Sequence, residues 1–324
     1  MAVAELEGAP AEWRAVREES QLSLFWRHFR KHRLALTGLG VLVVLILIAL
    51  LAPYITRYPR DQIILAEANM APGPTHWLGA DELGRDILTR LIYAGRISLF
   101  VGFAATIFSE LVGIIVGALA GYYGRFVDTL LMRFLDFMLT IPLLPVLLVM
   151  SAILSTGGLW FAIPSPIIRF TGWLMIINDL QAEQVLIMIF ILVVFGWLQA
   201  ARLMRGMLLS LRERDFVDAA RVVGASDLRI ILRHMLPNAM APIIVDATLL
   251  VGYFIVLEAA LSFLGFGIRP PTPTWGNMLS NVQEDMWLYP WKALYPGFCI
   301  FITSLCFNFV GDGLRDALDP RLRQ

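Results

Sequence analysis

The sequence predicts an all-α membrane protein with six transmembrane helices. Of its 324 residues, 58% are hydrophobic and 16% are charged, and the mean hydropathy is +0.70. Soluble domains contain about 45–50% apolar and about 25% charged residues, so this composition excludes an ordinary globular protein, a disordered chain and a coiled coil. The net charge is zero, which gives no indication of a nucleic-acid partner.

Six apolar stretches are long enough to cross a bilayer, which requires about 20 helical residues. They are residues 34–52, 98–119, 131–155, 184–204, 239–265 and 293–311. Membrane lipid is therefore an expected partner of most of the chain. The first stretch follows 33 other residues and is too long for the apolar part of a signal peptide, so we expect it to be retained as a helix.

Two other segments are expected to lie at the membrane surface. Residues 81–96 predict an interfacial helix, because Asp81 and Asp86 each precede an arginine by four residues beside an apolar stripe. The insertion 154–184 contains an apolar stretch (157–182) that prolines and glycines interrupt. We expect it to be interfacial or re-entrant, with Trp160 and Trp173 at the level of the headgroups.

The basic residues predict the orientation. If the N-terminus is inside, the inside segments hold 18 of the 26 Lys and Arg residues and the outside segments hold 8. The positive-inside rule then places both termini in the cytoplasm. This divides the chain into a cytoplasmic N-terminal segment (1–33), a first span with an external loop (34–97), a five-helix core (98–311) and a cytoplasmic tail (312–324). Within the core, the loop 205–238 is cytoplasmic.

Two sets of residues within the predicted spans stand out. The second span has a small residue at every fourth position, a pattern that allows another helix to approach closely. These residues are Ala105, Ser109, Gly113, Gly117 and Gly121. Three acidic residues, Glu110, Asp246 and Glu258, also lie within spans. Ionisable groups in a bilayer usually face a bundle interior or a watery cavity, so these are either candidates for a substrate pathway or hydrogen-bonded structural carboxyls.

The most informative segment is Asp215–Asn238, which reads DFVDAARVVGASDLRIILRHMLPN. Its spacing predicts a short helix with a small-residue face that includes Ala219 and Ala220. Gly224 can end this helix with a positive φ, and Ser226 can cap the next one. An apolar stripe on the second helix is expected at Leu228, Ile231, Leu232 and Met235, and Pro237 begins the fifth span. We expect the first helix to fit a groove of another protein.

This segment resembles the EAA loop of ABC-importer permease subunits. The matching residues are Asp218-Ala219-Ala220, Gly224 and Leu236-Pro237, with Asp218 in place of the usual Glu and His234 in place of Ile. Three further motifs are similar to those of C-type subunits of dipeptide and oligopeptide permeases. They begin at His76 (HWLGADELGRD), at Leu261 (LSFLG, followed by PPTPTWG) and at Gly311 (GDGLRDALDPR).

The resemblance implies the type I ABC-importer permease fold and a location in a bacterial or archaeal cell (inner) membrane. It also implies four kinds of partner, which are a homologous second permease chain, two ATP-binding subunits, an extracytoplasmic solute-binding protein and a peptide substrate. The EAA helix would couple the permease to the ATPases. The cargo could instead be nickel chelate, glutathione or another small solute.

No enzymatic motif is evident. A phosphate-binding loop requires a lysine directly after a glycine, whereas the only lysines, Lys31 and Lys292, follow Arg30 and Trp291. We therefore expect a non-catalytic subunit without cofactor or metal, with ATP and Mg bound by its partners. A remote alternative is an ion-coupled secondary transporter that uses Glu110, Asp246 and Glu258 as a relay, although no internal repeat supports it.

Overall fold

The computed structural model describes residues 26–155, 163–283 and 286–318, and within them the protein is built from helices. Among these residues, five helices are long and apolar enough to cross a membrane by themselves. They are α2 (Arg33–Leu50), α4 (Ile87–Tyr123), α8 (Asp179–Arg212), the continuous stretch that ends with α11 (Leu236–Phe263), and α13 (Pro290–Leu318). A bent pair, α5 (Arg125–Thr140) and α6 (Leu143–Ser155), supplies the sixth crossing if it counts as one span.

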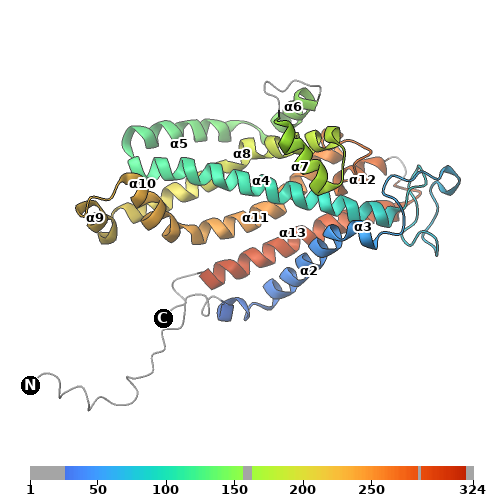
Figure 1. Ribbon diagram of the computed structural model, residues 1–324, viewed down its shortest axis with the longest axis horizontal. Helices are drawn as coiled ribbons and strands as arrows, with labels where there is room; N and C mark the ends of the chain where they lie inside the picture. Colours follow the sequence, from blue (N-terminus) through green and yellow to red (C-terminus); the bar gives the residue numbers. More distant parts are fainter. Residues whose placement is uncertain (1–25, 156–162, 284–285, 319–324) are drawn as a thin grey trace, which may run out of the picture.

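The long helices run roughly along the longest axis of the molecule (Figure 1). One end carries α9 (Asp215–Val222), and we call it the α9 end. The opposite end carries α3 (Ala52–Ile55), the turn η2 (Leu65–Glu67), α7 (Ser165–Met175) and α12 (Trp275–Asn281). The start of α2 and the end of α13 both lie toward the α9 end (Figure 1).

The third predicted span, residues 131–155, is wrong as a single straight helix. Its two halves meet at an angle of 88°. The break has a local cause, because Ile141 precedes Pro142 and a residue before proline is disfavoured in the helical conformation. Ile141 accordingly has extended backbone angles (φ −77°, ψ 127°).

The predicted interfacial helix over 81–96 is also wrong. Residues 81–86 form a turn closed by a bridge between Ala80 and Asp86, and α4 begins at Ile87 and continues without interruption through the second span. The Asp86 carboxylate accepts a hydrogen bond from the backbone N–H of Thr89 and so caps this helix. The expected Asp81–Arg85 ion pair is present (2.6 Å), but within the turn.

The segment after α6 contains only the short helix α7 among its described residues. Eleven residues span about 16 Å at about 1.5 Å per residue, which is too short to cross a bilayer of about 30 Å. Trp173 is 75% exposed, in agreement with a segment at the membrane surface. Trp160 lies outside the described residues.

The row of small residues on α4 packs against α8 of the same chain. A Cβ atom added to Gly113 would lie 2.5 Å from the Ala200 Cβ, and one added to Gly121 would lie 2.8 Å from the Leu208 Cβ. Residue numbers rise together along both helices, so α4 and α8 run parallel. Without side chains at these glycines, the two backbones approach closely over several turns.

Candidate functional site

The loop between α8 and α11 folds into a helix, a tight turn and a second helix at the α9 end. Helix α9 ends in a turn in which Gly224 adopts φ +84°, as the sequence predicts. The N–H of Ala225 donates to the carbonyl of Ala220 (3.0 Å), and the N–H of Gly224 donates to the carbonyl of Arg221 (2.9 Å). These two bonds form a Schellman motif, which satisfies the last carbonyls of a helix and favours glycine at the left-handed position.

The second arm of the loop is continuous with the fifth span. It begins with α10 (Asp227–Arg229), passes through one π-helical turn (Ile230–Met235) and continues as α11, with Pro237 in the first turn. Ser226 occupies the N-cap position, but the predicted side-chain cap is absent.

The apolar stripe predicted for the second arm is only partly correct. Met235 is fully buried and Ile231 is nearly so, whereas Leu228 and Leu232 are 66% and 54% exposed. The π-helical turn changes the helical period, which places Ile230 in the core in addition to Ile231.

A small hydrophobic core holds the loop in place. Val217 of α9 is fully buried and packs in one cluster with Ile230 and Met235 of the second arm and with Met204 and Leu208 of α8. The position of α9 is therefore determined by packing against the membrane helices as well as by the chain connection.

The outer surface of α9 combines exposed apolar residues with a local ion pair. Val222 and Val223 are 88% and 87% exposed. Arg221 donates to the carboxylate of Asp218 (2.8 Å), and Ala219 is also exposed. Of the remaining motif residues, Ala220 and Leu236 are half-buried and Pro237 is exposed. The loop thus presents a small apolar surface that the described residues of this chain leave exposed.

Of the three intramembrane carboxyls, Glu258 is enclosed completely. It has no exposed surface, and its carboxylate accepts hydrogen bonds from the hydroxyls of Ser98 (3.2 Å) and Ser262 (2.7 Å). The Ser98 hydroxyl in turn accepts from the backbone N–H of Trp275 (3.2 Å). This network connects α11, α4 and the start of α12.

Glu110 and Asp246 interact with each other between α4 and α11. Glu110 is 6% exposed, and among the described residues no N–H or hydroxyl group donates to either of its oxygens. Asp246 is half-buried. Glu110 differs from Glu258 because, within the described part of the chain, only the neighbouring Asp246 carboxyl compensates its burial, and a buried polar group with few partners is costly.

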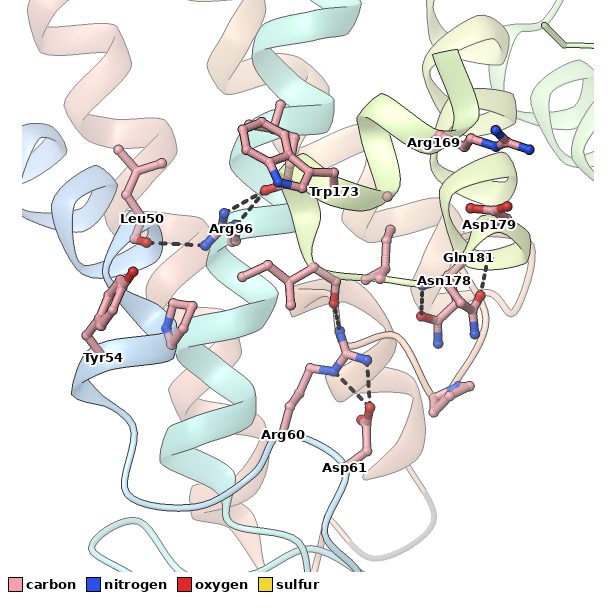
Figure 2. A pocket seen from close by; sticks show the side chains of 16 residues that line it. Leu50, Tyr54, Arg60, Asp61, Arg96, Arg169, Trp173, Asn178, Asp179 and Gln181 are labelled. Carbon is pink, nitrogen blue, oxygen red and sulfur yellow. Dashed lines mark hydrogen bonds and ion pairs between the residues drawn. The ribbon is translucent and has the colours of Figure 1, made fainter. Parts of the chain in front are cut away.

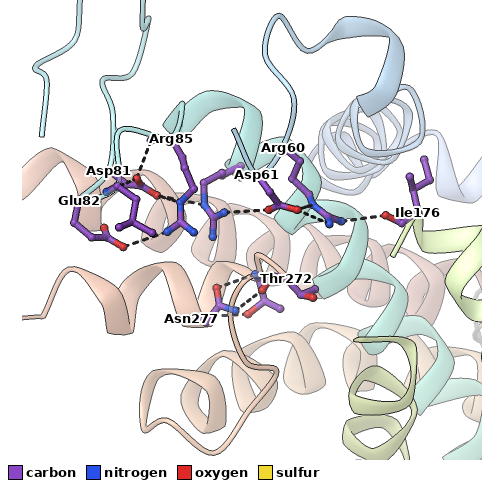
Figure 3. Close-up of polar contacts among 11 residues, drawn as sticks. Arg60, Asp61, Asp81, Glu82, Arg85, Ile176, Thr272 and Asn277 are labelled. Carbon is purple, nitrogen blue, oxygen red and sulfur yellow. Dashed lines mark hydrogen bonds and ion pairs between the residues drawn. The ribbon is translucent and has the colours of Figure 1, made fainter. Parts of the chain in front are cut away.

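A chain of polar contacts crosses the end opposite α9 (Figure 3). Arg85 pairs with Asp81, and Arg90 lies between Asp81 (3.5 Å) and Asp61 (3.6 Å). Arg60 donates to Asp61 and to the carbonyl of Ile176. The expected partner of Asp86 was Arg90, but Asp86 pairs with His76 instead. These contacts connect the loop after α3 to α4 and to the end of α7.

His76 is the most enclosed member of this region. Its two ring nitrogens contact Asp86 (2.8 Å) and Glu67 (2.9 Å), and its ring stacks on Tyr58. Burial lowers the pKa of His76, but the hydrogen bonds and negative charges of Glu67 and Asp86 outweigh this effect, so its pKa is raised above the ordinary value.

A pocket of about 970 Å³ opens at the same end between α3, α4, α7 and the start of α8 (Figure 2). Arg96 crosses it and donates to the carbonyls of Leu50 (3.2 Å) and Leu174 (2.6 Å), which joins α2 to α7. Arg169, Trp173 and Asp179 also line the pocket. Its wall therefore offers both signs of charge and an aromatic surface.

Sequence reasoning did not identify Arg96, or Tyr122 near the end of α4, as contact residues. Arg96 reaches the carbonyl of Leu174, which is 78 positions away, and the Tyr122 hydroxyl donates to Asp227 across 105 positions (2.7 Å). Neither contact produces a local periodic signal.

Comparisons with known proteins agree with this architecture. Residues 113–324 match the family described as binding-protein-dependent transport system inner membrane component. Residues 20–72 match the N-terminal transmembrane domain of oligopeptide transport permease C.

Three examples illustrate the relatives that match over most of the chain. It is 40% identical to the dipeptide transport system permease protein DppC of Alkalihalophilus pseudofirmus, over 92% of this chain and 89% of the relative. It is 37% identical to the oligopeptide transport system permease protein OppC of Bacillus subtilis, with coverages of 91% and 88%. It is also 37% identical to the glutathione transport system permease protein GsiD of Escherichia coli, with coverages of 92% and 90%.

Proposed function

The chain belongs to the family of binding-protein-dependent transport system inner membrane components, and from this premise we propose that it is a permease subunit of an ATP-driven importer of di- and oligopeptides. In this proposal the chain forms half of the translocation pathway and performs no bond-breaking chemistry. A homologous second permease chain forms the other half. Two ATP-binding subunits supply the energy and hold ATP and Mg, and an extracytoplasmic binding protein delivers the peptide.

The observation that carries the proposal is the exposed surface of α9. A helix held in place by the buried Val217 presents Val222 and Val223 to the surroundings, next to the exposed Ala219. Exposed apolar surface on a well-packed element is typical of a site that binds another protein. The small side chains allow close approach, and the Gly224 turn fixes the angle between the helix and the fifth span.

The position of α9 also gives the orientation of the chain in the membrane. We place the α9 end in the cytoplasm, where ATP is available, together with the start of α2 and the end of α13 (Figure 1). The excess of basic residues in the segments at this end supports the assignment. The charged pocket beside Arg169 and the polar chain around His76 then lie on the outer face, where a binding protein would dock.

We propose different roles for the acidic residues within the membrane. Glu110 and Asp246 are candidates for the pathway, because Glu110 is buried with no partner other than the Asp246 carboxyl, and ionisable groups within a bilayer usually face a bundle interior or a watery cavity. Glu258 was expected as a third candidate, and the hydrogen bonds that it accepts from Ser98 and Ser262 favour a structural carboxyl instead.

The proposal is tested by two loop variants in the complete complex. Gly224→Pro removes a φ of +84° that proline cannot adopt, together with the N–H that donates to Arg221. Ala220→Asp places a charge on the half-buried face of α9. Both variants should insert into the membrane normally but abolish uptake of a labelled dipeptide. Gly206→Ala, at an open site on α8, should insert normally and retain uptake. Normal import by both loop variants would refute coupling through α9.

The peptide cargo is tested separately by competition. Unlabelled di- and tripeptides should reduce the uptake of the labelled dipeptide in a strain that depends on this chain. Stronger competition by glutathione or by a nickel chelate would assign the importer to that cargo, in line with the glutathione permease among the relatives.

A further inference from the structure

Tyr122, near the end of α4, contacts α8, α9 and α10. Its hydroxyl donates to the carboxylate of Asp227 in α10 (2.7 Å). The guanidinium of Arg221 in α9 lies over its ring, 6.0 Å from the centroid. Its backbone carbonyl accepts from Arg212, the last residue of α8 (3.3 Å). Tyr122 is 7% exposed, whereas Arg221 and Asp227 lie at the surface, so the buried ring of Tyr122 anchors two exposed residues of the loop.

The two loop partners of Tyr122 flank the turn at Gly224. Arg221 precedes this turn and Asp227 follows it, so one phenol ring contacts both arms of the loop. Arg221 also pairs with Asp218, which occupies the acidic position of the loop motif. A continuous line of contacts therefore leads from Asp218 through Arg221 to the end of α4.

Helix α4 is suited to carry a displacement across the membrane. It contains 37 residues without an internal proline, which is about 55 Å at about 1.5 Å per residue. Its other end is capped by Asp86, which also contacts His76, and Arg90 one turn later contacts Asp81 and Asp61. A movement applied at Tyr122 thus reaches the polar contacts of the outer face through one rigid element.

We propose that Tyr122 is the positioning residue through which movement of the coupling loop is passed to α4, with its hydroxyl bond to Asp227 as the essential contact. This inference rests on the proposed role of α9 in coupling. It adds that α4, and not only the covalently connected α8 and α11, receives the movement. The hydrogen bond keeps the loop and the end of α4 together when the loop is displaced.

The test compares variants in the complete complex, reconstituted in liposomes with its ATPase subunits and binding protein. The measured quantity is the amount of labelled dipeptide transported per ATP hydrolysed. Tyr122→Phe keeps the ring and removes the donor, and Asp227→Ala removes the acceptor. Each variant removes the hydrogen bond that joins α4 to the loop, so each should lower the ratio severalfold.

Two controls separate coupling from folding. Asp227→Asn retains a carbonyl oxygen that accepts from the Tyr122 hydroxyl, so it should restore most of the ratio that Asp227→Ala loses. Tyr123→Phe alters the neighbouring ring, which is 48% exposed, and should leave the ratio unchanged. Because Tyr122 and Asp227 act as one pair, Tyr122→Phe combined with Asp227→Ala should be no worse than either change alone.

Ala220→Asp, measured in parallel, shows whether a negative result concerns only the role of Tyr122 or the coupling role of α9 itself. An unchanged ratio in Tyr122→Phe and Asp227→Ala, with transport lost in Ala220→Asp, would overturn the role of Tyr122 and leave coupling through α9 intact. Normal transport by Ala220→Asp would overturn the coupling proposal itself. If Tyr122→Phe fails to assemble, the comparison of Asp227→Ala with Asp227→Asn decides the question.

Discussion

The contact between α4 and α8 predicts a large effect from a single added methyl group. An alanine at position 113 would place its Cβ 2.5 Å from the Ala200 Cβ and 2.9 Å from the Trp197 carbonyl oxygen. Carbon atoms pack best about 3.5–4.0 Å apart, so the two helices must separate locally by about 1 Å or more. Overpacking of this kind costs about 1–3 kcal/mol, which exceeds the gain of about 0.5–1 kcal/mol from replacing a helical glycine with alanine.

A matched control is available on α8. Gly206 has no atom within 4 Å of an added Cβ, so Gly206→Ala should retain only the helical gain and be neutral or slightly stabilising. We expect Gly113→Ala to lower the thermal unfolding midpoint of the purified complex in detergent and Gly206→Ala to leave it unchanged or raise it. Equal midpoints for the two variants would refute close packing of α4 on α8 through the small-residue row.

Three further predictions concern titratable side chains. The pKa of His76 is raised in the folded protein, so its stabilising effect is complete below the ordinary value of about 6.5 and disappears as the pH rises through the raised value. His76→Gln should therefore lower the unfolding midpoint at acidic pH, and this deficit should shrink at alkaline pH; a deficit that is independent of pH would contradict an imidazolium bound to Asp86. Glu258→Gln should destabilise the protein, seen as a lower unfolding midpoint, because an amide cannot accept at both positions as the carboxylate does. Glu110→Gln and Asp246→Asn should each reduce dipeptide uptake with little change in the unfolding midpoint, and normal uptake by both would remove these residues from the pathway.

Features that depend on local spacing could be predicted from the sequence. The small residues at every fourth position of the second span predict close helix packing, and Gly113 and Gly121 indeed leave no space for a Cβ against α8. The left-handed conformation of Gly224 and the first-turn position of Pro237 follow from the backbone preferences of these two residue types. Five of the six predicted spans correspond to single helices, because the length and hydropathy of a local segment are enough to predict a transmembrane helix.

Features that depend on distant partners could not be predicted in this way. Asp86 precedes Arg90 by four residues, which is the spacing of a helical ion pair, but Asp86 caps α4 and contacts His76. Asp86 pairs with His76 rather than Arg90 because Glu67 and the loop around it hold His76 next to Asp86. The bend of the third span had a visible signal in Pro142, but its angle depends on how α5 and α6 pack in three dimensions. The contact between Tyr122 and Asp227 requires the complete fold.

The most direct test of the central claim is cross-linking from α9 to the ATPase. A single cysteine is introduced at Val222, which is 88% exposed, in a chain whose Cys299 and Cys306 are replaced by alanine. Tyr54, 85% exposed at the opposite end, provides the matched position. The account predicts that Val222→Cys cross-links to an ATP-binding subunit and does not react with membrane-impermeant thiol reagents in intact cells. Tyr54→Cys should react with these reagents and should not cross-link to an ATP-binding subunit. Labelling of Val222→Cys from outside, or an ATPase cross-link at Tyr54→Cys, would contradict it.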